Sequence, residues 1–74
     1  MVKAPEKLRR QMAARGWSDE TIAEAVASGN RHPAINRETG TPASRYIHPL
    51  TRRSVVIDDV SGEVIHVGGD GFIY

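Results

Sequence analysis

The stretch that decides the fold is residues 43–67, ASRYIHPLTRRSVVIDDVSGEVIHV, in which short β-branched runs alternate with turns. The runs ASRYIH, SVVID and EVIHV are each typical of a strand. A turn from Pro49 to Arg52 and the tetrapeptide DVSG separate them, and Gly62 suits a backbone with positive φ. The pattern predicts an antiparallel meander over residues 43–74, with FIY at the C-terminus as a further short edge strand.

Upstream of this segment the sequence has the signals of two helices. Pro5 suits a first helical position and Gly16 a C-terminal cap, which predicts a helix over 5–15. Ser18 is a suitable N-cap for a second helix over 19–28. Both helices have apolar residues at helical spacing, so each has a face to bury.

Residues 30–42, NRHPAINRETGTP, connect the helices to the sheet and indicate a basic loop, because they are rich in Pro, Gly, Asn and Thr. The whole chain, residues 1–74, is expected to form a single domain. Its predicted class is α+β, with two N-terminal helices packed on a small antiparallel sheet of three to four strands.

Length and composition restrict the class of protein. The chain has 74 residues and no cysteine, so it has no disulfide framework and no thiolate metal site. No stretch approaches the roughly 18 apolar residues of a membrane helix, and the N-terminus has no apolar run of the signal-peptide kind. We therefore expect no membrane anchor, and delivery across a membrane would need a larger carrier. Because the core of so short a chain is small, we also expect the domain to bind a partner tightly.

The net charge of +1 hides an uneven distribution. Residues 30–53 hold five arginines against one glutamate, a balance of +4, together with two histidines. Residues 54–74 hold four carboxylates and no Lys or Arg, a balance of −4. Guanidinium groups bind phosphate bidentately and stay charged at any relevant pH, so the arginine cluster indicates a phosphate ligand. A solvated basic loop is the plain alternative.

Histidine and arginine are the side chains with candidate chemistry. Cleavage of RNA by its own 2′-hydroxyl needs a base, an acid and cations around the phosphorane. Imidazoles titrate near neutral pH, which makes His48 and His66 the acid–base candidates, each with a structural strand histidine as the alternative. A metal site is not expected, because His32, His48 and His66 show no ligand spacing. A helix-turn-helix is disfavoured, since the second helix has no basic or amide side chain to read bases.

Strict alternation along the strands predicts which side chains share a face. It places Tyr46 and His48 on one side of their strand, and His66 on the side opposite to Ile65 and Val67. One face of the sheet would pack on the helices, and the other could form a shallow groove lined by Arg, His and Tyr.

The ordered combination of these motifs resembles the tRNA-anticodon ribonuclease domain of the colicin E-five type, over about residues 8–72. The tripeptide at 16–18 matches the Gly-Trp-Ser/Thr that opens a helix in that family. His66 stands where the family often has glutamine. The further matching positions are Ala43, Arg45, Tyr46, Val55, Val56, Asp58 and the hairpin 61–67.

This resemblance implies a barnase–EndoU–colicin–RelE type fold and an endoribonuclease that uses no metal and no cofactor. The implied substrate is tRNA, cut in the anticodon loop by 2′-hydroxyl attack to leave a 2′,3′-cyclic phosphate. The implied partner is a cognate immunity protein or antitoxin. The implied setting is a bacteriocin or contact-dependent-inhibition toxin whose tip acts in the bacterial cytoplasm. The family relies on Lys and Arg more than on His, whereas this chain has no lysine after Lys7. Its TRR at 51–53 occupies a turn where many relatives have glycine.

We therefore expect a catalytic set and an RNA-binding set of residues. The catalytic set is His48, His66, Arg45 and Arg53. The set that contacts phosphate or bases is Arg31, Arg37, Arg52 and Tyr46. Two other functions stay open: a non-catalytic basic module that binds nucleic acid or an acidic protein, and an antitoxin or immunity protein. The usual acidity of immunity proteins does not fit the +4 segment, and steep salt dependence with intact RNA would mark the binding module.

Overall fold

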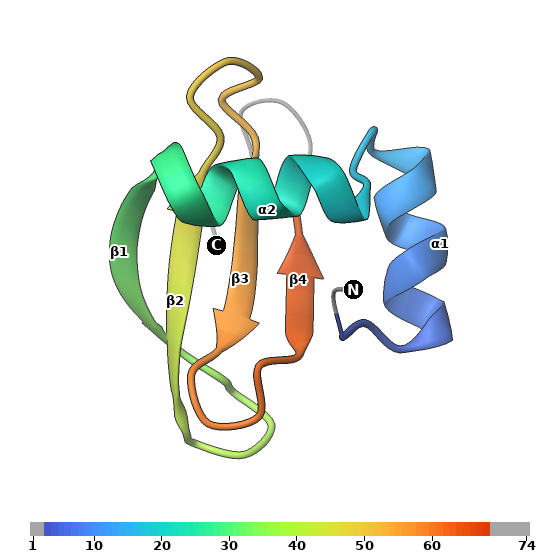
Figure 1. The fold of residues 1–74 in the computed structure, drawn as a ribbon. Coiled ribbons are helices and arrows are strands. Elements are labelled where there is room, and N and C mark those ends of the chain that lie inside the picture. The colour runs from blue at the N-terminus through green and yellow to red at the C-terminus, as the bar shows by residue number, and fades with distance from the viewer. Residues whose placement is uncertain (1–2, 69–74) are drawn as a thin grey trace.

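The computed structural model describes residues 3–68, which form two helices and one sheet (Figure 1). The elements are α1 (Glu6–Ala14), α2 (Asp19–Ser28), β1 (Asn30–Ile35), β2 (Pro42–Ile47), β3 (Ser54–Asp58) and β4 (Val64–Val67). The strands follow the order β1-β2-β3-β4 and every neighbouring pair is antiparallel. In Figure 1, α2 crosses one face of the sheet and α1 stands beside β4. The predicted α+β fold, with helices preceding an antiparallel sheet, is confirmed.

Local signals in the sequence explain where the helices begin and end. The Ser18 Oγ accepts a hydrogen bond from the Thr21 backbone N–H at 3.2 Å, and the Thr21 Oγ1 accepts one from the Ser18 N–H at 2.8 Å. This reciprocal cap satisfies backbone donors that a helix start leaves unpaired. After α1 the chain turns at Gly16, whose φ is +76°. This left-handed conformation favours glycine, and a Cβ atom there would also lie 2.3 Å from Arg53 Nη1, so the guanidinium would have to move.

The core lies between α2, α1 and the near face of the sheet. Trp17 is 5 % exposed, and its indole N–H donates to the Gly68 carbonyl at 2.9 Å, which ties the interhelix loop to the end of β4. Each fully buried aliphatic side chain contributes about 1.5–3 kcal/mol relative to an exposed one. The buried cluster comprises Met12, Trp17, Ile22, Ala25, Val55, Val64 and Val67.

The predicted basic loop over 30–42 is wrong for its first half. Residues Asn30–Ile35 form β1, and only the turn 36–41 connects it to β2. Pro33 argues against a strand in the sequence because it has no N–H to donate. β1 is at the edge of the sheet, where one side of the strand needs no partner, and an edge strand tolerates proline.

The predicted alternation in the last strand is also wrong. Val64 and Val67 are both in the core, although they are three positions apart, a spacing that would put them on opposite faces of a regular strand. The register between β3 and β4 shifts between Val56 and Ile57, as in a β-bulge, and the extra residue turns both valines inward.

Other features of the described chain agree with the sequence pattern. Gly62 has a φ of +75° in the β3–β4 turn, and β4 ends at Val67, directly before Gly68. The proposed edge strand at 72–74 lies outside the described residues. Within residues 3–68, no helix is long and apolar enough to cross a membrane.

Candidate functional site

A row of side chains crosses the sheet on the face away from α2. His32 is directly opposite Arg45 in the register, Arg45 is opposite Val56, and Val56 is opposite His66. Residues opposite one another in neighbouring strands share a face. Arg45 forms no ion pair with any carboxylate among residues 3–68, so its guanidinium is available to an anion. We call this set (His32, Arg45, Val56 and His66) the open-face row.

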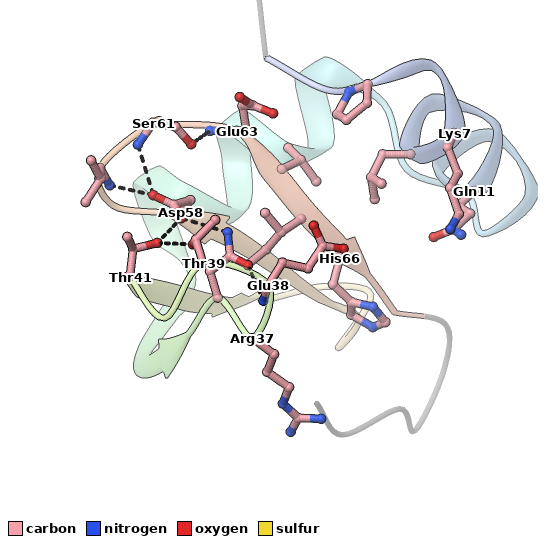
Figure 2. A pocket seen from close by; sticks show the side chains of 16 residues that line it. Lys7, Gln11, Arg37, Glu38, Thr39, Thr41, Asp58, Ser61, Glu63 and His66 are labelled. Atoms are coloured by element: carbon pink, nitrogen blue, oxygen red, sulfur yellow. Dashed lines mark hydrogen bonds between the residues drawn. The ribbon is translucent and has the colours of Figure 1, made fainter.

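His66 also lines a cavity of about 720 Å³ that opens beside the row. α1 provides Lys7 and Gln11 on one side, and the β1–β2 turn provides Glu38 on the other; Arg37 also belongs to the lining, and Figure 2 shows its side chain extending outward from the turn. Burial lowers the pKa of His66 below its ordinary value of 6.5, and the nearby Arg15 guanidinium lowers it further. The cavity therefore combines a titratable imidazole with two cationic side chains and three carboxylates. We call it the His66 pocket.

A buried carboxylate fixes the shape of one end of this pocket. Asp58 is 3 % exposed and accepts hydrogen bonds from Asn36 Nδ2 at 2.9 Å and from the Thr41 hydroxyl. Its other oxygen accepts from the backbone N–H groups of Val60 and Ser61 at 2.7 and 2.9 Å. The Thr41 and Asn36 hydrogen bonds, which favour the charged form, hold the pKa of Asp58 far below 3.8. Asp58 thus joins the β1–β2 turn to the β3–β4 turn (Figure 2).

His48 lies on the other side of the sheet, 3 % exposed and next to α2. Its Nδ1 accepts hydrogen bonds from the backbone N–H groups of Leu50 and Thr51 at 3.1 and 3.3 Å, so the proton is on Nε2. Nε2 then donates to Glu24 Oε1 at 3.1 Å. The ring also meets Trp17 edge-on, with centroids 6.3 Å apart. The structure therefore separates His48 from His66, the two histidines that the sequence suggested as a pair.

Two of the predicted RNA-binding residues, Arg31 and Tyr46, make contacts within the domain on the α2 side of the sheet. Arg31 Nε donates to Ser44 Oγ at 2.8 Å, and Arg31 Nη2 is 3.6 Å from Asp59 Oδ2. Tyr46 packs against the core cluster and lies opposite Arg31 in the register. Neither side chain lies on the face that holds the open-face row.

The remaining predicted arginines are at three different places. Arg37 lines the His66 pocket. Arg52 is exposed in the β2–β3 turn, where its φ is +62°. Arg53 Nη1 donates to the Arg15 carbonyl at 3.0 Å and lies against Gly16, so it links the β2–β3 turn to the interhelix loop.

Sequence reasoning predicted only Arg37 and His66 among the residues that line the pocket, and the polar residues that it missed include Lys7, Gln11 and Glu38. Lys7 and Gln11 are four residues apart on α1, a spacing that places both on one face of the helix. Glu38 is the single acidic residue of the basic segment 30–53, which was a signal in the sequence. Among residues 3–68, no group of three His, Asp or Glu side chains is placed to bind a metal ion.

Comparison with known proteins links this geometry to a family. The family model described as colicin E5 ribonuclease domain matches residues 4–70. A search of curated proteins and of solved structures gives no significant match. The matched range includes every strand, both helices and all residues of the open-face row and the His66 pocket. Because the match covers nearly the whole chain, the protein belongs to the family of colicin E5 ribonuclease domains.

Proposed function

We propose that this domain is a metal-independent endoribonuclease toxin that cuts tRNA in the anticodon loop, with the His66 pocket as its active site. The 2′-hydroxyl of one nucleotide attacks the adjacent phosphate, and the products carry a 2′,3′-cyclic phosphate and a 5′-hydroxyl. Membership of the colicin E5 ribonuclease family supports RNA as the substrate.

The observation that carries this proposal is the presence of His66 in one pocket with Lys7 and Arg37. An imidazole exchanges protons near working pH, and cations stabilise the charge that develops on the phosphorane. His66 is therefore our proton-transfer residue. An imidazole can act either as a general acid or as a general base in this reaction.

Arg45 is our second phosphate-binding residue, and it complements Arg37 from across the sheet. Arg45 and His66 are two strands apart, which separates their backbones by about 10 Å. We propose that a phosphodiester and its ribose span this interval; Val56, which lies between Arg45 and His66 in the register, is fully buried and does not contact them. A guanidinium can then bind the phosphate bidentately while the imidazole reaches an oxygen of the same group.

We assign supporting roles to the other predicted residues. His48 holds the β2–β3 turn, and Arg53 ties that turn to the interhelix loop. Arg52, exposed on the same turn, is placed to contact a distant phosphate of a long RNA. Arg31 and Tyr46 stabilise the α2 side of the sheet and contact no substrate in this proposal.

The proposed partner is a cognate immunity protein or antitoxin that covers the open-face row. An acidic partner surface would complement Arg45, Arg37 and Lys7 and would block access to His66. The proposed site of action is the cytoplasm of a bacterial target cell, which the domain reaches as the tip of a larger toxin.

The test is incubation of the purified domain with total bacterial RNA in excess EDTA, followed by a denaturing gel and 3′-end analysis. We expect discrete tRNA halves that end in cyclic phosphate. Intact RNA that nevertheless binds the domain with steep salt dependence would overturn the proposal in favour of a non-catalytic binding module.

A further inference from the structure

Three carboxylates line the His66 pocket, and they differ in what they can do. Asp58 is buried and accepts four hydrogen bonds, which lower its pKa and make it a poor proton acceptor. In Figure 2, the Glu63 side chain points away from His66, whereas Glu38 points into the pocket on the side of His66. Glu38 is the carboxylate that a substrate beside His66 would meet.

The turn that holds Glu38 has a defined conformation. The Glu38 backbone N–H donates to Asn36 Oδ1 at 3.1 Å, and the same Asn36 side chain donates to buried Asp58 at 2.9 Å. Asn36 N–H also donates to the Thr41 carbonyl at 2.8 Å, and Gly40 closes the turn with a φ of +72°. A buried anchor thus fixes the backbone of Glu38, as a group that must meet a substrate requires.

We propose that Glu38 is the second proton-transfer residue of this site and acts as the general base, with His66 as the general acid. The inference rests on the proposed ribonuclease function and deepens it. Glu38 and His66 come from different elements, the β1–β2 turn and β4, and face one cavity. Cleavage by the 2′-hydroxyl needs two separate groups, because one proton leaves the attacking oxygen and another is given to the leaving oxygen.

The proton balance is complete with these two groups. The Glu38 carboxylate takes the proton of the 2′-hydroxyl as the bond from the 2′-oxygen to phosphorus forms. The bond from phosphorus to the 5′-oxygen breaks, and the His66 imidazolium gives its proton to that leaving oxygen. The cationic side chains of Arg37 and Lys7 stabilise the phosphorane. Water then restores the proton on His66 and removes the one on Glu38.

The charges around His66 set the pH dependence. The charged groups that line its pocket or act on it are Arg15, Lys7, Arg37, Glu38, Asp58 and Glu63. Burial, and next the Arg15 guanidinium, favour the neutral imidazole and lower the pKa of His66 below its ordinary value of 6.5. As the general acid, His66 predicts that kcat/KM declines as the pH rises through this lowered pKa.

The experiment compares wild type, Glu38→Gln and the control Glu20→Gln, an exposed α2 carboxylate outside the pocket, on a defined anticodon stem-loop RNA in EDTA, with kcat/KM measured from pH 4 to pH 8. We expect Glu38→Gln to lose about 100-fold or more in kcat, because general acid–base catalysis contributes about 10²–10⁴-fold. Glu20→Gln keeps the wild-type profile. Circular dichroism checks that both variants fold, which the exposure of both side chains favours.

The possible outcomes separate this inference from the proposed function. If wild type cleaves RNA and Glu38→Gln retains its rate within threefold with an unchanged pH profile, Glu38 is not the base and the inference is wrong. If Glu20→Gln loses as much as Glu38→Gln, cleavage depends on the overall charge of the domain and the inference is again wrong. If wild type itself leaves RNA intact, the proposed function fails first.

Discussion

Replacement of His48 by alanine distinguishes a structural histidine from a catalytic one. The imidazole is 3 % exposed and accepts hydrogen bonds from two backbone N–H groups, those of Leu50 and Thr51. A buried donor that loses its acceptor costs about 1–3 kcal/mol. Partial access of water to the exposed turn reduces the cost, and the lost contact with Trp17 adds to it. We therefore expect His48→Ala to destabilise the domain by about 2–4 kcal/mol.

This loss is a large fraction of the total stability, which is about 5–15 kcal/mol for ordinary domains and near the lower limit for small ones. For a chain of this size, the melting temperature falls by about 4–8 °C per kcal/mol. His48→Ala should then melt about 8–32 °C below wild type. The assay is urea unfolding followed by circular dichroism, with thermal melting in parallel.

The matched control is His32→Ala, which removes an exposed histidine from the other face of the sheet. It should change the unfolding free energy by at most about 0.5 kcal/mol. Activity is measured at a temperature where both variants are folded, and His48→Ala should then keep its turnover within about tenfold. A His48→Ala variant that is as stable as wild type but catalytically dead would refute the structural role and restore the catalytic one.

Three further predictions concern other parts of the molecule. Asp58→Asn should lower the urea midpoint of unfolding. In wild type, the carboxylate should stabilise the fold above pH 3.8 and lose this effect as the pH falls below 3.8, because the pKa of Asp58 is lower in the folded than in the unfolded state; an acid titration followed by circular dichroism checks this. Arg45→Ala should weaken RNA binding and reduce the slope of log K against log salt by about 1, whereas Arg10→Ala, an exposed helix residue paired with Glu6, should leave the slope unchanged in filter binding. Trp17→Phe removes the donor to the Gly68 carbonyl and should cost about 1–3 kcal/mol in thermal melting; an unchanged melting temperature would contradict the role of that bond.

Sequence patterns were sufficient for the elements that depend on local chemistry. The cap at Ser18 and the left-handed turns at Gly16 and Gly62 follow from the preferences of single residues, and the structure confirms them. The strands SVVID and EVIHV follow from β-branched composition bounded by turns.

Features that depend on pairing between distant strands could not be predicted from local sequence patterns. β1 contains Pro33 and becomes a strand because β2 pairs with it along one edge. The bulge in β4 has no local signal, yet it decides that Val67 faces the core and that His66 faces the pocket.

The candidate site shows the same limit. The sequence identified His66, Arg37 and Arg45 by residue type, and they lie on one side of the sheet. It could not reveal that His48 faces α2, since a histidine at the end of a strand has no pattern that distinguishes the two faces. It also missed Glu38, because only the Asp58 anchor brings that turn beside His66.

The most direct test of the central claim is the cleavage rate of His66→Ala on an anticodon stem-loop RNA in EDTA, measured beside wild type with the melting temperature of both. A proton-transfer residue at the centre of the site predicts a loss of at least about 100-fold in kcat/KM with the melting temperature almost unchanged. Cleavage at the wild-type rate by a folded His66→Ala variant would contradict the claim that the His66 pocket is the active site.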